Sequence, residues 1–237
     1  MRSLALAAVL LVAVPSLAQD CPVPDSAKAG GLAHKTAAER LTYLSNAIAT
    51  ESTRARRWTL GWGGAYGLLT VAQLAVAPAF DGPDRVDWYV GAFTTVVGVA
   101  FVLFDPLEVI DGGETFADRA AHATPENTCA LLAEAERLVK QGADHEAFNT
   151  AWYSHVANVL FNAGVGLFLW LAYDRLASGL VNFGVGTAMG EGTIFTSPTG
   201  LVDAWSAYEQ GEKTAVHFHL APAIGPNLVG VRFGLTF

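Results

Sequence analysis

The sequence predicts an all-α membrane protein, with four transmembrane helices arranged as two tandem helical-hairpin repeats, flanking amphipathic helices and a short C-terminal β-hairpin. Three observations carry this prediction: long uncharged apolar segments, a similar order of features in the two halves, and strict alternation near the C-terminus. Of the 237 residues, 52% are hydrophobic and 15% are charged, whereas soluble domains carry roughly 25% charged residues. The apolar residues come in runs, which favours lipid as their environment.

The first 18 residues have the three parts of a cleavable signal peptide. Arg2 supplies positive charge, an apolar run of 11 residues follows, and Ser16 and Ala18 are the small residues that precede a cleavage site. The run is too short to cross a bilayer. We therefore expect an exported chain that begins at Gln19. The residues before Cys21 lack the small side chains of a lipoprotein site.

Four segments follow that are long enough to cross the hydrocarbon, for which a helix needs about 20 apolar residues. They are residues 58–80, 88–104, 147–173 and 176–202. His155 interrupts the third and Glu191 the fourth. The connections at 81–85 and 174–175 are short, so each pair of helices is expected to form an antiparallel hairpin.

The two halves share an order of features that indicates an internal duplication. Each opens with a cap and an amphipathic helix, at Thr36 with Glu39 and at Thr124 with Pro125. Each hairpin then turns at an Asp-Arg pair, and each second helix ends at a proline. The predicted boundaries are 1–18 for the signal peptide, 19–33 for an exported linker, 34–116 for repeat 1, 117–123 for a linker, 124–210 for repeat 2 and 211–237 for the β-hairpin.

The C-terminal segment changes to alternation with a period of two, over 215–221 and 229–237, which is typical of a two-stranded hairpin. The ending resembles the last strand of an outer-membrane barrel, but such barrels need at least eight strands. His217 and His219 share one face of the first strand. Two ligands do not make a metal site, so we interpret them as exposed strand residues.

Orientation rests on two rules that disagree. Cleavage of the signal peptide leaves the N-terminus outside, and four spans return the C-terminus outside. Cys21 and Cys129 then share an oxidising compartment and are expected to form a disulfide. Arg54, Arg56 and Arg57, just before the first span, favour the opposite orientation by the positive-inside rule. We follow the signal peptide and expect the cell membrane, with the outer membrane as the less favoured alternative.

Charge and motifs exclude several classes of function. Without Arg2, 13 basic residues face 22 acidic ones, a net charge of −9, so no nucleic-acid partner is expected. His145 and Glu146 begin a segment that resembles a zinc-protease helix, but Asn149 replaces its second histidine. A haem with two histidine ligands would need His155 from two copies of the chain. We expect no catalytic residues, metal or cofactor.

The most informative polar residues lie in the third and fourth spans. His155, Asn158 and Asn162 share one helical face at spacing i, i+3, i+7. Folding the hairpin about residues 174 and 175 places Asn158 opposite Glu191 and Asn162 opposite Thr187. Polar groups in lipid normally satisfy one another. The cluster is therefore either a contact that joins two helices or a site for an ion, a proton or a ligand.

The first hairpin offers only Gln73 opposite Thr94, so a site of this kind would occur once per chain. The leading hypothesis is a non-enzymatic integral membrane component of the cell envelope, an assembly or interaction scaffold. Its expected partners are membrane lipid and either a second copy or other envelope proteins. The alternative is a small conduit or binding protein for an ion or solute, which would use the polar cluster between the third and fourth spans.

Overall fold

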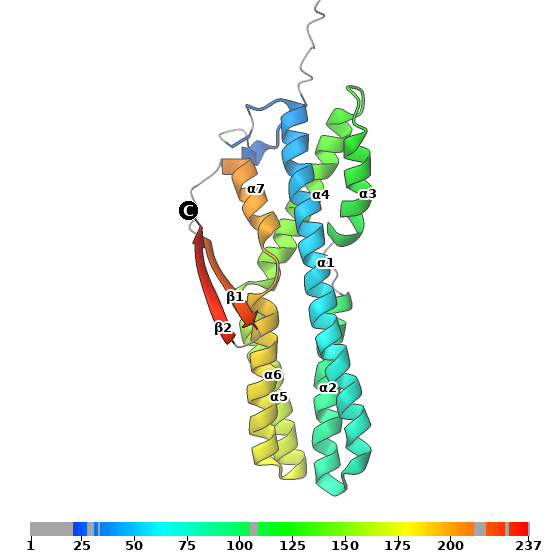
Figure 1. Ribbon diagram of the computed structural model, residues 1–237, viewed down its shortest axis with the longest axis vertical. Helices are drawn as coiled ribbons and strands as arrows, with labels where there is room; N and C mark the ends of the chain where they lie inside the picture. The colour runs from blue at the N-terminus through cyan, green and yellow to red at the C-terminus, as the bar shows by residue number, and fades with distance from the viewer. Residues whose placement is uncertain are drawn as a thin grey trace, which may run out of the picture.

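The computed structural model describes residues 21–27, 31–32, 34–104, 109–210, 217–225 and 228–236. The predicted signal peptide lies outside the described residues. The protein is mostly helical and elongated, with two parts stacked along the long axis (Figure 1). We call residues 37–57, 109–149 and 200–210 the head, and residues 58–104 and 152–195 the stem.

The described helices are α1 (Ala37–Val76), α2 (Gly82–Phe104), α3 (Val109–Ala121), α4 (Thr128–Asn149), α5 (Trp152–Tyr173), α6 (Leu176–Phe195) and α7 (Gly200–Gln210), with short 3-10 turns at Asp25–Ala27 and Ala77–Ala79. Two strands, β1 (His217–Gly225) and β2 (Leu228–Thr236), pair antiparallel, with His217 opposite Thr236 and Gly225 opposite Leu228.

The helix α1 runs without interruption for 40 residues through both parts. It starts where the sequence predicts, at a capping box in which the Glu39 N–H donates to the Thr36 hydroxyl and the Glu39 carboxylate accepts from the Thr36 N–H. The second half of the chain differs, because α4 stops at Asn149 and α5 begins two residues beyond Thr150. The predicted first-turn proline of α4 is wrong: Pro125 lies in a turn before the helix.

The head has a hydrophobic core of its own, built from α1, α3, α4 and α7. On α1 and α4 most of its members are spaced three or four residues apart, so that one face of each of these helices is buried. Fully buried side chains include Leu44, Ile48, Phe116, Leu132 and Val139. Burial of apolar surface at about 25 cal/mol per Å² is the main source of stability for such a core.

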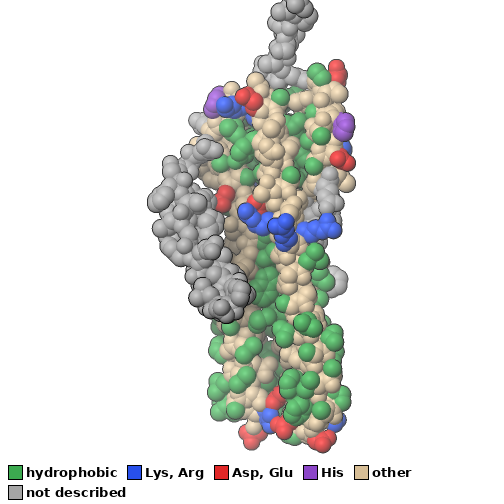
Figure 2. Space-filling view, in the orientation of Figure 1, with side chains coloured by type: hydrophobic (Ala, Val, Ile, Leu, Met, Phe, Trp, Pro, Cys, Tyr) green, Lys and Arg blue, Asp and Glu red, His purple; other side chains and the backbone are tan. Residues whose placement is uncertain are grey.

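The stem has the opposite distribution, because it exposes its large apolar side chains. Leu68 is 72% exposed, Trp152 74% and Phe195 76%. Green apolar side chains cover the lower part of the molecule, below a band of basic residues (Figure 2). Among the described residues, three helices are long and apolar enough to cross a membrane: Ala37–Ala79, Gly82–Leu103 and Trp152–Tyr173. Exposed apolar surface on this scale indicates a membrane protein.

Within the stem, α1 packs against α2, and α5 packs against α6. The two backbones come close together at Gly166 and Gly179, where a Cβ on Gly179 would lie 2.4 Å from the carbonyl oxygen of Gly166. Gly63 and Gly67 of α1 have the spacing of four residues that lets membrane helices pack closely, but they do not both serve this purpose here. A Cβ at Gly67 would meet no atom within 4 Å, so this glycine faces open space.

Candidate functional site

The polar cluster predicted in the second hairpin is assembled where α5 and α6 face each other. The Nδ1 atom of His155 lies 2.5 Å from Oε2 of Glu191. The amide of Asn158 donates to Oε1 of Glu191 at 2.9 Å and to the carbonyl of Thr187 at 3.0 Å. Asn162 donates in turn to the carbonyl and side-chain oxygens of Asn158, both at 2.9 Å. Four side chains from two helices therefore form one network.

The pairing of Asn158 with Glu191 is as the sequence predicts, whereas Asn162 differs. Its side chain packs against Gly186, and the hydroxyl of Thr187 is buried without a hydrogen-bond partner. The two asparagine side chains fill the space that glycines leave on α6, Asn162 at Gly186 and Asn158 at Gly190. The absence of a side chain at these glycines thus makes room for the two amides. As a result, Asn162 faces Gly186, one residue before its predicted partner Thr187.

The chemistry of this cluster is that of a carboxylate between two donors. Both oxygens of Glu191 accept a hydrogen bond, and the side chains of His155 and Glu191 remain 29% and 23% exposed. His155 can carry a proton, and Glu191 can accept one or bind a cation. As it stands, the network satisfies its own polar groups, which is what a contact between two helices in lipid requires.

Three further hydrogen bonds join the hairpins near the head among the described residues, and the sequence did not suggest them. In the longest of them, the indole N–H of Trp58 donates to the Thr196 hydroxyl at 3.3 Å. The hydroxyls of Tyr66 and Thr193 lie 2.9 Å apart and are buried. The indole N–H of Trp62 donates to the Thr196 hydroxyl at 2.8 Å. In the first hairpin the residue that faces Gln73 is Thr95, with 3.4 Å between their oxygens, and not Thr94.

At the other end of the stem, the turns are joined by charge. Arg175, from the α5–α6 turn, forms ion pairs with Asp84, at 2.6 Å, and with Asp87. Ser178 also donates to Asp87 at 2.6 Å. Arg175, the basic residue of the Asp-Arg pair at the second turn, therefore contacts the first hairpin.

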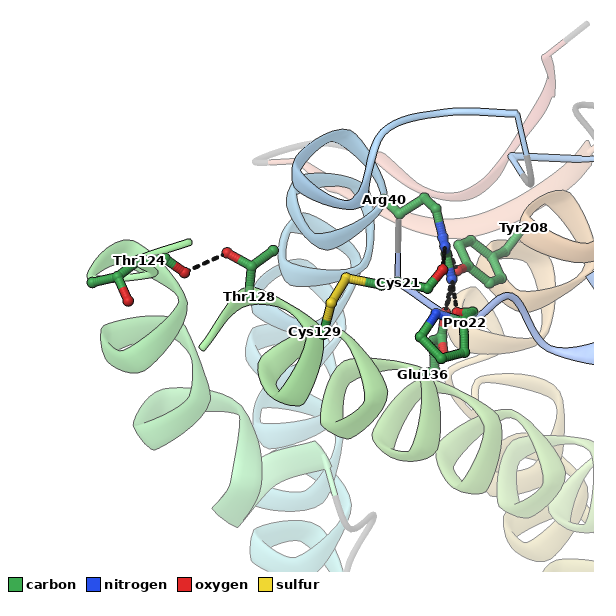
Figure 3. Close-up of a disulfide and its surroundings, with 8 residues drawn as sticks. All are labelled: Cys21, Pro22, Arg40, Thr124, Thr128, Cys129, Glu136 and Tyr208. Atoms are coloured by element: carbon green, nitrogen blue, oxygen red, sulfur yellow. Dashed lines mark hydrogen bonds and ion pairs between the residues drawn. A yellow bond between two sulfur atoms is a disulfide. The ribbon is translucent and has the colours of Figure 1, made fainter. Parts of the chain in front are cut away.

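The head contains a disulfide and a buried arginine side by side (Figure 3). Cys21 and Cys129 are bonded, as predicted, over a sequence separation of 108. Arg40, 2% exposed, donates to the carbonyls of Cys21 and Pro22 at 3.4 and 3.0 Å. Its guanidinium thus holds the N-terminal segment next to the disulfide.

The same arginine joins α4 and α7 to α1. Its Nε donates to the Tyr208 hydroxyl at 2.7 Å, and its Nη2 lies 2.5 Å from the Glu136 carboxylate. Tyr208 also donates to Glu136. Burial raises the pKa of Tyr208, and the carboxylate of Glu136 raises it further. Arg40 lies four residues before Leu44 and eight before Ile48, and so on the apolar face of α1. A charged residue on an apolar helix face is the feature of the sequence that could have indicated this buried network.

A second buried charge, Glu146, lies where the α6–α7 connection enters the head. It is fully buried, and its Oε2 accepts hydrogen bonds from the N–H groups of Leu201 and Val202 at 2.8 and 3.2 Å. These are free donors of the first turn of α7. Burial raises the pKa of Glu146 to about 7 despite these bonds, and the nearby carboxylates of Glu51 and Asp203 add to the rise.

Glu146 also lies seven residues after the buried Val139 and so on the apolar face of α4. Over the residues that the structure describes, no group of three His, Cys, Asp or Glu side chains is placed to hold a metal. Comparison with family models, with curated proteins and with solved structures finds no match to this chain.

Proposed function

We propose that this chain is an exported, multi-pass component of the cell envelope and that it serves there as a non-enzymatic assembly or interaction scaffold. The observation that carries the proposal is the division of the molecule into a folded head and an apolar stem. The head has its own core, a disulfide and the network around Arg40. A folded, disulfide-bonded head on a membrane anchor is suited to binding partners, either a second copy or other envelope proteins.

The proposal includes four spans, with α6 as the fourth. The helix α6 is shorter and richer in glycine than the three helices named above, and it carries Glu191. Its membrane placement is supported by its packing along α5 and by the exposure of Leu180, Val181 and Val185 at 60–63%.

We also propose that residues 34–116 and 124–210 are repeats. The order of elements supports this: α1, α2 and α3 in one half correspond to α4 with α5, then α6, then α7 in the other. The last short helix of each half packs on the head part of its own first helix, α3 on α1 and α7 on α4. The C-terminal β-hairpin follows the second repeat as an addition.

For localisation we propose the cell membrane, with both termini and the head outside. The disulfide in the head supports an oxidising compartment. Arg54, Arg56 and Arg57 are exposed on α1 just before the stem begins, and by the charge rule they support the opposite side. Figure 2 shows a band of basic side chains where head and stem meet. An outer membrane would remove this conflict, because the charge rule describes insertion across the inner membrane.

The scaffold role can be tested with a photo-crosslinking amino acid placed at exposed positions in cells. We expect Asn46 on α1 or Ala133 on α4 to give a discrete crosslinked protein. Leu68 in the stem is the matched lipid-facing control and should give none. The absence of any discrete product from the head, together with ion flux through the purified protein in liposomes, would contradict the scaffold.

A second candidate function, a small conduit or binding protein for an ion or solute, is favoured by one observation. The cluster of His155, Asn158, Asn162 and Glu191 places a carboxylate and an imidazole 2.5 Å apart with part of their surface exposed. If the cluster only joins helices, Glu191→Gln should keep the fold and leave liposome flux at background, as in wild type. If it binds a cation or relays a proton, wild type should show flux, and both Glu191→Gln and His155→Ala should abolish it.

A further inference from the structure

A groove runs along the stem between α2 and α5, on the half nearer the turns. Its volume is about 750 Å³. Val86, Tyr89 and Phe93 of α2 line one side, and Leu160, Gly164 and Phe168 of α5 line the other. Phe93 and Leu160 are 59% and 66% exposed. The walls carry no charged side chain.

The groove stays open because the two hairpins are joined elsewhere. Near the head, Tyr66 bonds Thr193 between α1 and α6. At the turns, Arg175 and Ser178 bond Asp87. These contacts fix the distance between the hairpins at both ends, while α2 and α5 have few direct contacts with each other. The space between these two helices is therefore left for another molecule.

We propose that this groove binds an acyl chain of a membrane phospholipid. Both α2 and α5 are long and apolar enough to cross a membrane, so the groove opens into hydrocarbon. An empty space there would forfeit dispersion contacts, and water would lack the two to four polar partners that it needs. Lipid acyl chains surround these helices, and an acyl chain in the groove costs less free energy than either an empty space or water.

The extent of the groove favours a lipid chain over a second copy of the protein. Val86 to Phe93 and Leu160 to Tyr173 correspond to about 10–20 Å of helix at 1.5 Å per residue, similar to one leaflet, about half of the 30 Å hydrocarbon. A helix from a second copy would need a contact face along the whole span. Tyr89 and Tyr173 lie toward the turns, at the level where tyrosine side chains meet lipid headgroups.

The test uses full-length protein in liposomes that contain a phosphatidylcholine with a photoactivatable diazirine in its acyl chain. After illumination, labelled residues are mapped by mass spectrometry. We expect the groove residues Phe93, Leu160 and Phe168 to be labelled about fivefold more than Leu68 and Leu180, which face lipid outside the groove; fivefold corresponds to ~1 kcal/mol. This inference rests on the membrane placement of α2 and α5 and does not depend on the scaffold role.

Gly164→Phe fills the groove, and a Cβ at Gly164 meets no atom within 4 Å, so the fold should be kept. The matched control is Gly184→Phe on α6, where a Cβ is equally free. Gly164→Phe should remove the excess labelling, and Gly184→Phe should leave it. Uniform labelling, or an excess that survives Gly164→Phe, would overturn the proposal. So would protection of the groove together with a dimer, measured by sedimentation, that Gly164→Phe dissociates.

Discussion

Three charged side chains are buried in the part of the head that the structure describes, Arg40, Glu51 and Glu146, and Arg40 and Glu146 are stabilised to different degrees. Arg40 has donors matched to two carbonyls, a hydroxyl and a carboxylate. Glu146 has two donors on one oxygen, while its other oxygen, Oε1, is buried without a hydrogen bond. A buried polar atom without a partner costs about 1–3 kcal/mol. The unpaired oxygen of Glu146 is therefore expected to lower the stability of the head.

The pH dependence of stability should reveal this cost. The pKa of Glu146 rises from 4.5 to about 7 on folding, so between these values the folded protein binds the proton more tightly than the unfolded chain. The free energy of unfolding should therefore fall as pH rises from about 4.5 to about 7. At 1.36 kcal/mol per pKa unit, the loss is on the order of 3 kcal/mol.

Glu146→Gln should remove the contribution of Glu146 to this pH dependence and raise the melting temperature at pH 8 by several degrees, because an amide carries no charge to bury. Its oxygen can still accept the N–H of Leu201. Burial also raises the pKa of Glu51, so a smaller dependence of the same sign should remain. Thermal unfolding in detergent from pH 5 to 8 measures the effect. Asp144→Asn, at an exposed ion pair with Lys140 on the same helix, is the control and should follow wild type. Equal pH profiles for Glu146→Gln and wild type would show that another group titrates.

Among the elements, the disulfide connects the N-terminal segment to α4 across 108 positions. A loop of this length should contribute roughly 4–5 kcal/mol in the chain-entropy model, less what the membrane already restrains. Reduction should slow migration in electrophoresis and lower the melting temperature. Cys129→Ser should reproduce both effects without reductant. Labelling of both thiols in native protein would contradict the disulfide.

The close approach of α5 and α6 gives a sharper prediction. A Cβ at Gly179 would overlap the backbone of Gly166, which cannot move aside as a side chain can. Gly179→Val should therefore push the helices apart and cost about 1–3 kcal/mol or more. Gly184→Val on the same helix adds the same atoms in open space and should be nearly neutral. Thermal stability of the two variants in one detergent makes the comparison.

Sequence periodicity predicted the elements well where one local rule decided them. The capping box at Thr36 fixed the start of α1, and the length of the 174–175 connection fixed the register that brings Asn158 to Glu191. Contacts between hairpins could not be predicted, because no sequence spacing relates Tyr66 to Thr193 or Arg175 to Asp87. The head could not be predicted for the same reason. Amphipathic helices were expected, but no sequence spacing showed that four helices would pack around one core.

For the molecule as a whole, the orientation of the stem is the main prediction. Single cysteines at Asp84, in the first turn of α2, and at Asp174, between α5 and α6, should be protected from an impermeant thiol reagent in intact cells. Cysteines at the exposed head positions Asn46 and Lys140 should react. Each variant carries its cysteine in a background in which Cys21 and Cys129 are both serine. Reaction at the turns and protection of the head would reverse the proposed topology.

The uninterrupted course of α1 has a mechanical consequence. A helix of 40 residues is about 60 Å long and bends little, so it acts as a lever whose lower arm lies in the bilayer and whose upper arm carries the head. A change in tilt of about 10° in the stem would move the far end of the upper arm by roughly 5 Å. The interruption between α4 and α5 at Thr150 supplies the joint that lets the second half follow. Bilayer thickness influences the tilt of a span. A change in bilayer thickness would therefore shift the position of the head surface that partners contact.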